Sequence, residues 1–207
     1  MTADRLLNPL KMWLNSKPMA APATKPRIFT IGHSNRVIEE FVAMLDVQKL
    51  KLVVDVRTIP KSHHNPQYNG LQLAKSLERH GIQYIHILGL GGLRRTRKDS
   101  PNQGWRNSSF RGYADYMQTE EFDKNLRKLI ALSKRKRLVI MCAEALPWRC
   151  HRSLIADALL ARGLAVSDLL DMGSPKPHKM TSFAKMTGIR VSYPKPSLSA
   201  TPFQQNQ

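Results

Sequence analysis

Residues 142–152 bring together side chains that could carry out a reaction. Both cysteines of the chain fall here, with a carboxylate, an imidazole and two guanidinium groups: Cys142, Glu144, Arg149, Cys150, His151 and Arg152. A thiolate can attack an electrophile, an imidazole can exchange a proton near neutral pH, and a carboxylate can act as a general base. We therefore predict Cys142, Glu144 and His151 as candidate catalytic residues.

Each of these residues also has a structural interpretation. Free cysteines are often small buried hydrophobes, so Cys142 could simply end a core strand. Cys150 lies about one turn before Leu154 on the expected helix, which favours a packing role. Metal binding by the two cysteines with His151 and His33 is disfavoured, because neighbours on a helix point about a quarter-turn apart and zinc-finger spacing is absent. We expect no metal and no other cofactor.

Four arginines are candidate ligands for an anion: Arg57, Arg111, Arg149 and Arg152. Positive side chains at the start of a helix oppose its dipole, so a phosphate or carboxylate beside Arg149 and Arg152 would relieve that cost. Asp55 could touch the substrate or pair with Arg57, its neighbour on the same face of a strand. Further candidates for the same site are His33, Asn35, Gly91, Gly92 and Tyr113.

The elements between these residues must position them. Apolar, β-branched runs predict strands over 27–32, 51–56, 83–88, 138–142 and 164–170, and apolar periodicity predicts helices over 38–49, 71–80, 120–132 and 148–162. Strands that alternate with helices predict a single α/β domain, a Rossmann-like, doubly wound, mostly parallel sheet of about five strands. We expect this domain over residues 27–186, after a loosely ordered extension (1–26) and before a flexible tail (187–207).

In a parallel sheet all strands end at one edge, where ligands bind. The candidate residues follow four predicted strands: His33 and Asn35 the first, Asp55 and Arg57 the second, Gly91 and Gly92 the third, and Cys142 and Glu144 the fourth. We therefore predict a shared pocket at this edge. The polar segment 89–112 exceeds ordinary connection lengths and is expected to be functional or mobile.

The chain is strongly basic. Its formal net charge is +18, of which residues 1–26 contribute +3 and residues 172–207 contribute +5, leaving +10 for the residues between. This balance favours an anionic small molecule or nucleic acid as partner, although a solvated basic face is the simpler alternative. Two cysteines in this length indicate a cytoplasmic protein rather than a secreted disulfide scaffold, and we expect no membrane span.

Six ordered motifs resemble one known family. They are Ile31–Asn35, Val54–Arg57 with Pro60, Leu90–Gly92, Phe110–Met117, Met141–Glu144 continued by Cys150–Arg152, and His178 with Thr181 and Phe183. Over residues 27–186 the chain resembles the bacterial domain-of-unknown-function 488 family. The resemblance supports the α/β fold and the location of the site, and implies no established reaction. It departs at Ser62-His63-His64, where a Ser-Arg segment is expected, so no arginine-specific role is expected there.

These observations predict an enzyme that acts on an anionic, phosphate- or nucleotide-bearing substrate, as a hydrolase or transferase. A covalent step at Cys142 would be possible, with Cys150 as resolving partner or bystander. One alternative is a non-catalytic protein that binds nucleic acid or nucleotides with the same basic edge and the aromatic side chains of segment 89–112. Another is a thiol redox or metal sensor built on Cys142 and Cys150.

Overall fold

In the computed structural model, which describes residues 27–195, six strands form one sheet. They are β1 (Arg27–Gly32), β2 (Leu52–Asp55), β3 (Gln83–His86), β4 (Leu138–Cys142), β5 (Ala165–Leu169) and β6 (Lys176–Pro177). Their order is β3-β2-β4-β1-β5-β6, and every pair is parallel except β5 and β6. The expected extension 1–26 and residues 196–207 of the expected tail lie outside the described residues.

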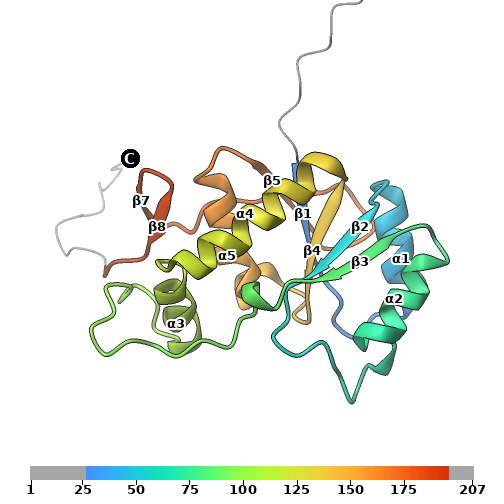
Figure 1. Cartoon of the computed structure of the whole chain (residues 1–207), viewed down its shortest axis with the longest axis horizontal. Coiled ribbons are helices and arrows are strands. Elements are labelled where there is room, and N and C mark those ends of the chain that lie inside the picture. Colours follow the sequence, from blue (N-terminus) through green and yellow to red (C-terminus); the bar gives the residue numbers. More distant parts are fainter. Residues whose placement is uncertain (1–26, 196–207) are drawn as a thin grey trace, which may run out of the picture.

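Helices cover both faces of the sheet (Figure 1). On one face lie α1 (Ile38–Val47) and α2 (Gly70–Glu78), and on the other lie α3 (Ser108–Tyr116), α4 (Glu120–Arg135) and α5 (Arg152–Leu160). Short 3-10 helices η2 (Pro66–Tyr68), η3 (Leu88–Leu90) and η4 (Pro147–Arg149) and the hairpin of β7 (Lys185–Thr187) and β8 (Arg190–Ser192) complete the described chain. Among the described helices, none combines the length and apolarity needed to cross a bilayer.

The alternation of side chains along β1 and β4 explains why both faces are covered. Phe29 and Met141 belong to the core beneath α1 and α2, whereas Ile28 and Ile140 belong to the core that includes residues of α3, α4 and α5. A strand buried on both faces is apolar at successive positions. This holds for all of β4 and for the interior of β1 except Thr30, whose hydroxyl donates to Asp168. Cys142, the last residue of β4, lies in the second core and therefore faces α5.

The mixed α/β domain confirms the predicted class, but the sheet has six strands rather than about five. The additional strand, β6, has only two residues, both exposed, and one of them is Pro177. A strand of two residues is too short to show the alternation of apolar side chains from which strands are predicted. In the observed order β4 lies between β1 and β2, so the strand order of a Rossmann fold is not confirmed.

Two helices beside the predicted pocket differ most from the prediction. Residues 108–116, for which no helix was predicted, form α3 across the end of the expected loop 89–112, and its N-cap Asn107 accepts hydrogen bonds from the backbone N–H groups of Ser109 and Phe110. The helix predicted from residue 148 begins only at Arg152, because η4 and an extended residue precede it. Both differences lie beside the predicted pocket and change where its side chains point.

The predicted boundary at residue 186 is too early. Val191 and Tyr193, within the expected tail, are 3% and 0% exposed and belong to the core. The Tyr193 hydroxyl donates to Asp157 at 2.8 Å, and its backbone N–H donates to the side-chain oxygen of Asn102 at 2.9 Å. Two apolar residues are too short a signal in the sequence, and their partners lie far away along the chain. The folded part therefore extends at least to Tyr193.

Candidate functional site

The carboxyl ends of β1, β2 and β4 meet at one edge of the sheet. Gly32 lies opposite Cys142 in the parallel register of β1 and β4. Beyond the strands, the backbone N–H of His33 donates to the carbonyl oxygen of Cys142, and that of Val56 donates to Met141, both at 3.0 Å. These hydrogen bonds continue the ladder, so that residues after three different strands border the same space.

The loop after β4 packs directly on Gly32. A Cβ at this position would lie 2.6 Å from the carbonyl carbon of Glu144 and 2.8 Å from the guanidinium group of Arg152. The fully buried Arg152 in turn holds the loop, because its Nη1 and Nη2 atoms donate to the carbonyl oxygens of Glu144 and Ala145 at 2.6 and 2.8 Å. Arg152 therefore supports the loop, and it does not line the pocket in which we predicted that it would bind an anion.

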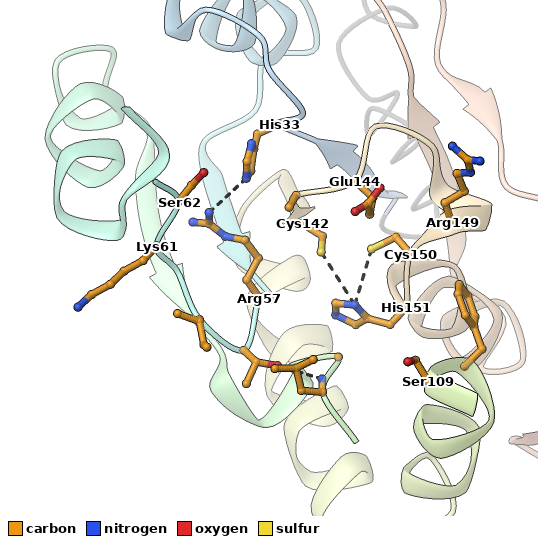
Figure 2. A pocket seen from close by; sticks show the side chains of 16 residues that line it. His33, Arg57, Lys61, Ser62, Ser109, Cys142, Glu144, Arg149, Cys150 and His151 are labelled. Atoms are coloured by element: carbon orange, nitrogen blue, oxygen red, sulfur yellow. Dashed lines mark hydrogen bonds between the residues drawn. The ribbon is translucent and has the colours of Figure 1, made fainter. Parts of the chain in front are cut away.

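A pocket of about 460 Å³ opens at this edge (Figure 2). It is bordered by the segments that follow β1, β2, η3 and β4, by η4 and by the first turn of α3. The residues that line it are His33, Arg57, Thr58, Ile59, Lys61, Ser62, Gly92, Leu93, Ser109, Phe110, Cys142, Ala143, Glu144, Arg149, Cys150 and His151. A pocket of this size accommodates a small molecule.

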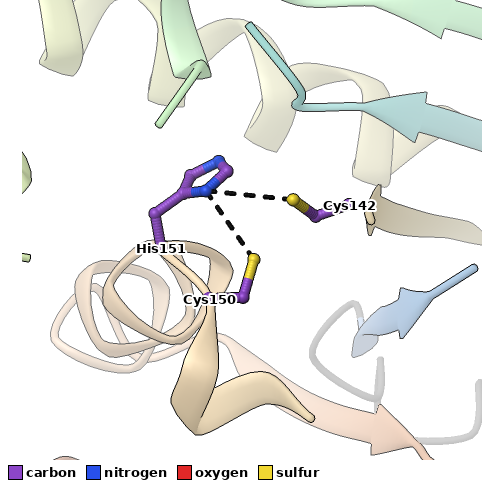
Figure 3. Close-up of side chains that lie close together, drawn as sticks. All are labelled: Cys142, Cys150 and His151. Atoms are coloured by element: carbon purple, nitrogen blue, oxygen red, sulfur yellow. Dashed lines mark hydrogen bonds between the residues drawn. The ribbon is translucent and has the colours of Figure 1, made fainter. Parts of the chain in front are cut away.

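His151 faces both thiols. Its Nδ1 atom lies 3.9 Å from the Cys142 sulfur and 3.7 Å from the Cys150 sulfur (Figure 3). Its Nε2 atom lies 2.9 Å from the carbonyl oxygen of Val56. A carbonyl oxygen can only accept, so Nε2 carries the ring proton of the neutral histidine and Nδ1 turns its lone pair to the sulfurs.

Gly92 leaves the room that this ring needs. A Cβ at Gly92 would clash with the imidazole, at 2.8 Å from its Cγ atom. The ring also packs near Tyr113, with ring centroids 5.0 Å apart. The imidazole of His151 is therefore in close contact with a glycine and near a buried aromatic ring, in an orientation fixed by Val56.

The two thiols differ in acidity. A hydrogen bond from Cys150, and then His151 and the positive charge of Arg152, hold the pKa of the Cys142 thiol well below its usual value, although burial opposes this. The neighbouring Cys142 sulfur, and then burial, raise the pKa of Cys150 well above its usual value. Cys142 is therefore the sulfur more readily present as a thiolate, the form that attacks electrophiles and binds metals.

The backbone conformation at Cys150 allows the side chains of Cys150 and His151 to point in the same direction. Two neighbours in a regular helix point in different directions, but Cys150 is extended, with φ −138° and ψ 144°, between η4 and α5. His151 is the N-cap of α5. This change of backbone conformation lets both side chains turn toward Cys142, and all three ligand atoms lie within 4.8 Å of one another.

His33 and Arg57 form the neighbouring wall of the pocket. The Asp55 carboxylate accepts hydrogen bonds from Nη2 and Nε of Arg57, the shortest at 2.6 Å, as the ion-pair interpretation predicted. Nδ1 of His33 donates to the carbonyl oxygen of Ser34 at 2.8 Å, so its Nε2 accepts from Nη1 of Arg57 at 3.2 Å. Burial, the larger cause, and the charge of Arg57 lower the pKa of His33, which favours the neutral ring.

Charged side chains border the opening of the pocket. Lys61 follows β2, Glu144 follows β4 and Arg149 ends η4, and all three are exposed. Within residues 27–195, neither Lys61 nor Arg149 takes part in an ion pair. Their charges are therefore available to an anion that enters the pocket, and Glu144 does not neutralise them.

Several predicted site residues do not line the pocket. Asn35 is exposed in the turn after β1, and Arg111 donates to the carbonyl oxygen of Trp105 at 2.8 Å. Tyr113 is fully buried, with its hydroxyl donating to the carbonyl oxygen of Leu90 at 3.0 Å. Gly91 and Asp55 are buried behind the pocket wall. None of these residues faces the interior of the pocket.

The sequence reasoning did not identify several other lining residues as site residues: Thr58, Ile59, Lys61, Ser62, Leu93, Ser109 and Phe110. Thr58 and its neighbours follow β2 directly, so extension of the predicted strand end by a few residues would have included them. Phe110 enters the prediction only as one of the aromatic side chains of segment 89–112 that could bind nucleic acid or nucleotides. Of the aromatic side chains in segment 89–112, Phe110 lines the pocket, while Trp105 packs behind it at 4.6 Å between ring centroids.

Comparison with known proteins gives one finding. The family model described as "Domain of unknown function DUF488" matches residues 37–159, which include β4, η4 and all of α5 except its last residue. Neither the curated proteins nor the solved structures contain a significant match to the chain.

Proposed function

The chain belongs to the DUF488 family, a domain of unknown function, and from its pocket we propose that it is a cytoplasmic enzyme that acts on an anionic, phosphate- or nucleotide-bearing substrate. The reaction would be hydrolysis or group transfer at the carboxyl-terminal edge of the sheet. The observation that carries this proposal is the contact between the Cys142 sulfur and Nδ1 of His151, 3.9 Å apart, on the wall of a pocket bordered by Lys61 and Arg149.

The pairing of a thiol with an imidazole supports an enzyme rather than a binding protein. A pocket that only binds an anion has no need of a sulfur, which is a weak hydrogen-bond acceptor and repels anions as a thiolate. In this arrangement the tautomer of the histidine is fixed and its acceptor nitrogen lies beside a thiol. The thiol can then act as a nucleophile or a ligand, with the histidine as the base that takes its proton. Glu144 lines the same pocket and supplies a third group that can move a proton.

The charge of the opening supports an anionic substrate. Lys61 and Arg149 are exposed and lie apart from the ion pairs of the described chain, so an incoming phosphate would be their counter-ion. Arg57, although it lines the pocket, is already held by Asp55 and His33. Phe110 adds an aromatic ring to the same lining, which suits the base of a nucleotide.

The proposal is tested by binding measurements on the full chain with pairs of compounds that differ only by a phosphate. Each phosphorylated member, for example a nucleoside monophosphate, is expected to bind about tenfold more tightly than its nucleoside. Arg149→Gln should remove most of that difference, whereas Arg135→Gln, at the exposed end of α4, should not. Equal affinity for both members of every pair would overturn the proposal.

Binding of long DNA or RNA to the same variants tests the nucleic-acid alternative. A non-catalytic protein would bind long DNA or RNA with an affinity that falls steeply with salt, through many exposed lysines and arginines. Substitution of one pocket residue would then change the affinity little. Strong binding that is insensitive to both Arg149→Gln and Cys142→Ser would favour this alternative and contradict the proposed enzyme.

A further inference from the structure

Two cysteines and a histidine form a three-membered cluster at the wall of the pocket. The Nδ1 atom of His151 lies 3.9 Å from the Cys142 sulfur and 3.7 Å from the Cys150 sulfur, and Figure 3 shows both sulfurs pointing at that nitrogen. Within residues 27–195 this is the single cluster of three side chains with metal-binding spacing. We propose that Cys142, Cys150 and His151 bind one zinc ion, with one coordination position open to the pocket.

The observed distances are close to those of a tetrahedral zinc site. With Zn–S bonds of about 2.3 Å and Zn–N bonds of about 2.0 Å, a sulfur and a nitrogen on the same ion are about 3.5 Å apart. The sulfur-to-Nδ1 distances of 3.7 and 3.9 Å exceed this value by only a few tenths of an ångström. Small side-chain rotations would therefore complete the coordination without a change in the backbone.

The orientation of His151 gives independent support. A histidine that binds a metal through one nitrogen usually donates the N–H of the other to a carbonyl or carboxylate oxygen, which fixes the tautomer and the ring. Val56 does this for His151, at 2.9 Å from Nε2. Nδ1 is left as an acceptor that faces two sulfurs, and a single thiol would suffice if it were only the base of a nucleophile.

The types of ligand select the metal. Two thiolates and an imidazole suit zinc and other borderline or soft ions, whereas magnesium and calcium prefer oxygen ligands. Two thiolates also balance the charge of a divalent ion, so the ion would add no net charge beside Arg152 and Arg57. A set of three protein ligands, with the fourth position free for water or substrate, is typical of a catalytic rather than a structural zinc site.

The pocket provides space for that fourth ligand. Cys142, Cys150 and His151 all line it, together with Glu144 (Figure 2). Bound there, zinc would polarise a water molecule. Glu144 would take one proton of this water while the water oxygen forms a bond to the electrophilic carbon or phosphorus of the substrate. The bond to the leaving group would break with its electron pair, and the proton would pass from Glu144 to that group, so the net reaction is hydrolysis.

This inference rests on the proposed function only for the substrate, and the binding of the ion is tested without one. The full chain, purified under reducing conditions without added metal, is expected to contain about one zinc per chain by elemental analysis. Cys142→Ser, Cys150→Ser and His151→Gln should each reduce the zinc content at least tenfold. Glu144→Gln, in the same pocket, and His63→Gln, an exposed histidine, should retain it.

A second measurement separates loss of ligands from loss of the fold. Cobalt(II) added to the reduced, metal-free chain should produce a thiolate-to-cobalt charge-transfer absorption, which Cys142→Ser and Cys150→Ser each weaken and the double variant abolishes. Circular dichroism should show that these variants stay folded. If a single variant unfolds, the cobalt spectrum of the wild-type chain still decides the question.

The proposal is overturned if the wild-type chain holds no zinc and gives no charge-transfer absorption with cobalt. It is also overturned if the double cysteine variant binds the ion as well as the wild-type chain, or if the purified protein contains a Cys142–Cys150 disulfide in place of metal. Failure here with retained selectivity for phosphate would leave the proposed function standing. Stoichiometric zinc without any preference for phosphate would support the zinc site and contradict the proposed function.

Discussion

The Nε2 atom of His151 donates a hydrogen bond to the carbonyl oxygen of Val56 at 2.9 Å. Val56 follows β2 directly, and its own N–H donates to Met141 in β4, so the acceptor belongs to the rigid edge of the sheet. The backbone that follows β2 therefore orients the imidazole of His151 toward the thiol of Cys142, the last residue of β4. The nearby His33 has the opposite tautomer, because its Nδ1 donates to the carbonyl oxygen of Ser34 at 2.8 Å.

This relationship predicts two different neutral histidines. In long-range ¹⁵N–¹H spectra of the metal-free chain at neutral pH, His151 should carry its proton on Nε2 and His33 on Nδ1. Because burial and Arg57 lower the pKa of His33, its ring should take up a second proton at a lower pH than an ordinary histidine does. His33→Gln and His151→Gln would assign the two signals. A Nδ1-protonated His151 would contradict the orientation that both proposals use.

A second prediction concerns the glycine beside this ring. Gly92→Ala would place a methyl group against the imidazole of His151, 2.8 Å from Cγ, and should push the ring away from the sulfurs. We expect the affinity for zinc or cobalt to fall about 10- to 100-fold, the range seen when the orientation of a ligand is lost. Ser109→Ala, elsewhere on the pocket wall, is the matched control. Unchanged affinity in Gly92→Ala would show that the ring can move freely.

Part of this site could be predicted from the sequence for a simple physical reason. Parallel strands end at the same edge whatever their order, so the residues after β1, β2 and β4 were bound to lie at one edge of the sheet. They are close together because β4 lies between β1 and β2, an order that the sequence does not reveal. The register confirms this, with Gly32 opposite Cys142. The ion pair of Asp55 and Arg57 was equally accessible, because residues two apart on a strand share a face.

The directions of the side chains could not be predicted. The sequence reasoning placed Arg149 and Arg152 on the first turn of one helix, but the turn η4 and the extended Cys150 interrupt it. Arg149 is therefore exposed, while Arg152 is fully buried against the loop. The same interruption brings Cys150 and His151 together, which the assumption of a regular helix disfavoured. Local backbone breaks of this kind depend on tertiary packing rather than on apolar periodicity.

These positions predict a division of roles between Arg152 and Arg149. Arg152→Lys keeps the charge but loses the planar fork that donates to both Glu144 and Ala145, so we expect a loss of about 1 to 3 kcal/mol in the free energy of unfolding. Arg149→Gln should leave that free energy within about 0.5 kcal/mol, as for most surface substitutions. Urea denaturation of both variants is the measurement. The prediction is wrong if Arg149→Gln is the more destabilising change.

A final prediction concerns pH and the buried histidine that joins the end of the folded chain to the sheet. His178 lies between Asp157 in α5 and Asp168 in β5, with Nε2 3.3 Å and Nδ1 2.9 Å from their carboxylates. Although burial opposes protonation, hydrogen bonds to Asp157 and Asp168 raise the pKa of His178 from 6.5 to about 9. The folded protein therefore binds this proton more tightly than the unfolded chain does.

The stabilisation follows from that difference. It is fully present below pH 6.5, where His178 is protonated in both states, and is lost as the pH rises toward 9, where the folded protein also releases the proton. A shift of this size corresponds to about 3 kcal/mol. The free energy of unfolding should fall over this range in the wild-type chain and much less in His178→Gln, and the difference between the two removes the contribution of other titrating groups. Parallel pH profiles would contradict the raised pKa and would mean that His178 is neutral in the folded protein over this range. The two carboxylates would then be stabilised by their other hydrogen-bond donors, Tyr193 for Asp157 and Thr30 for Asp168.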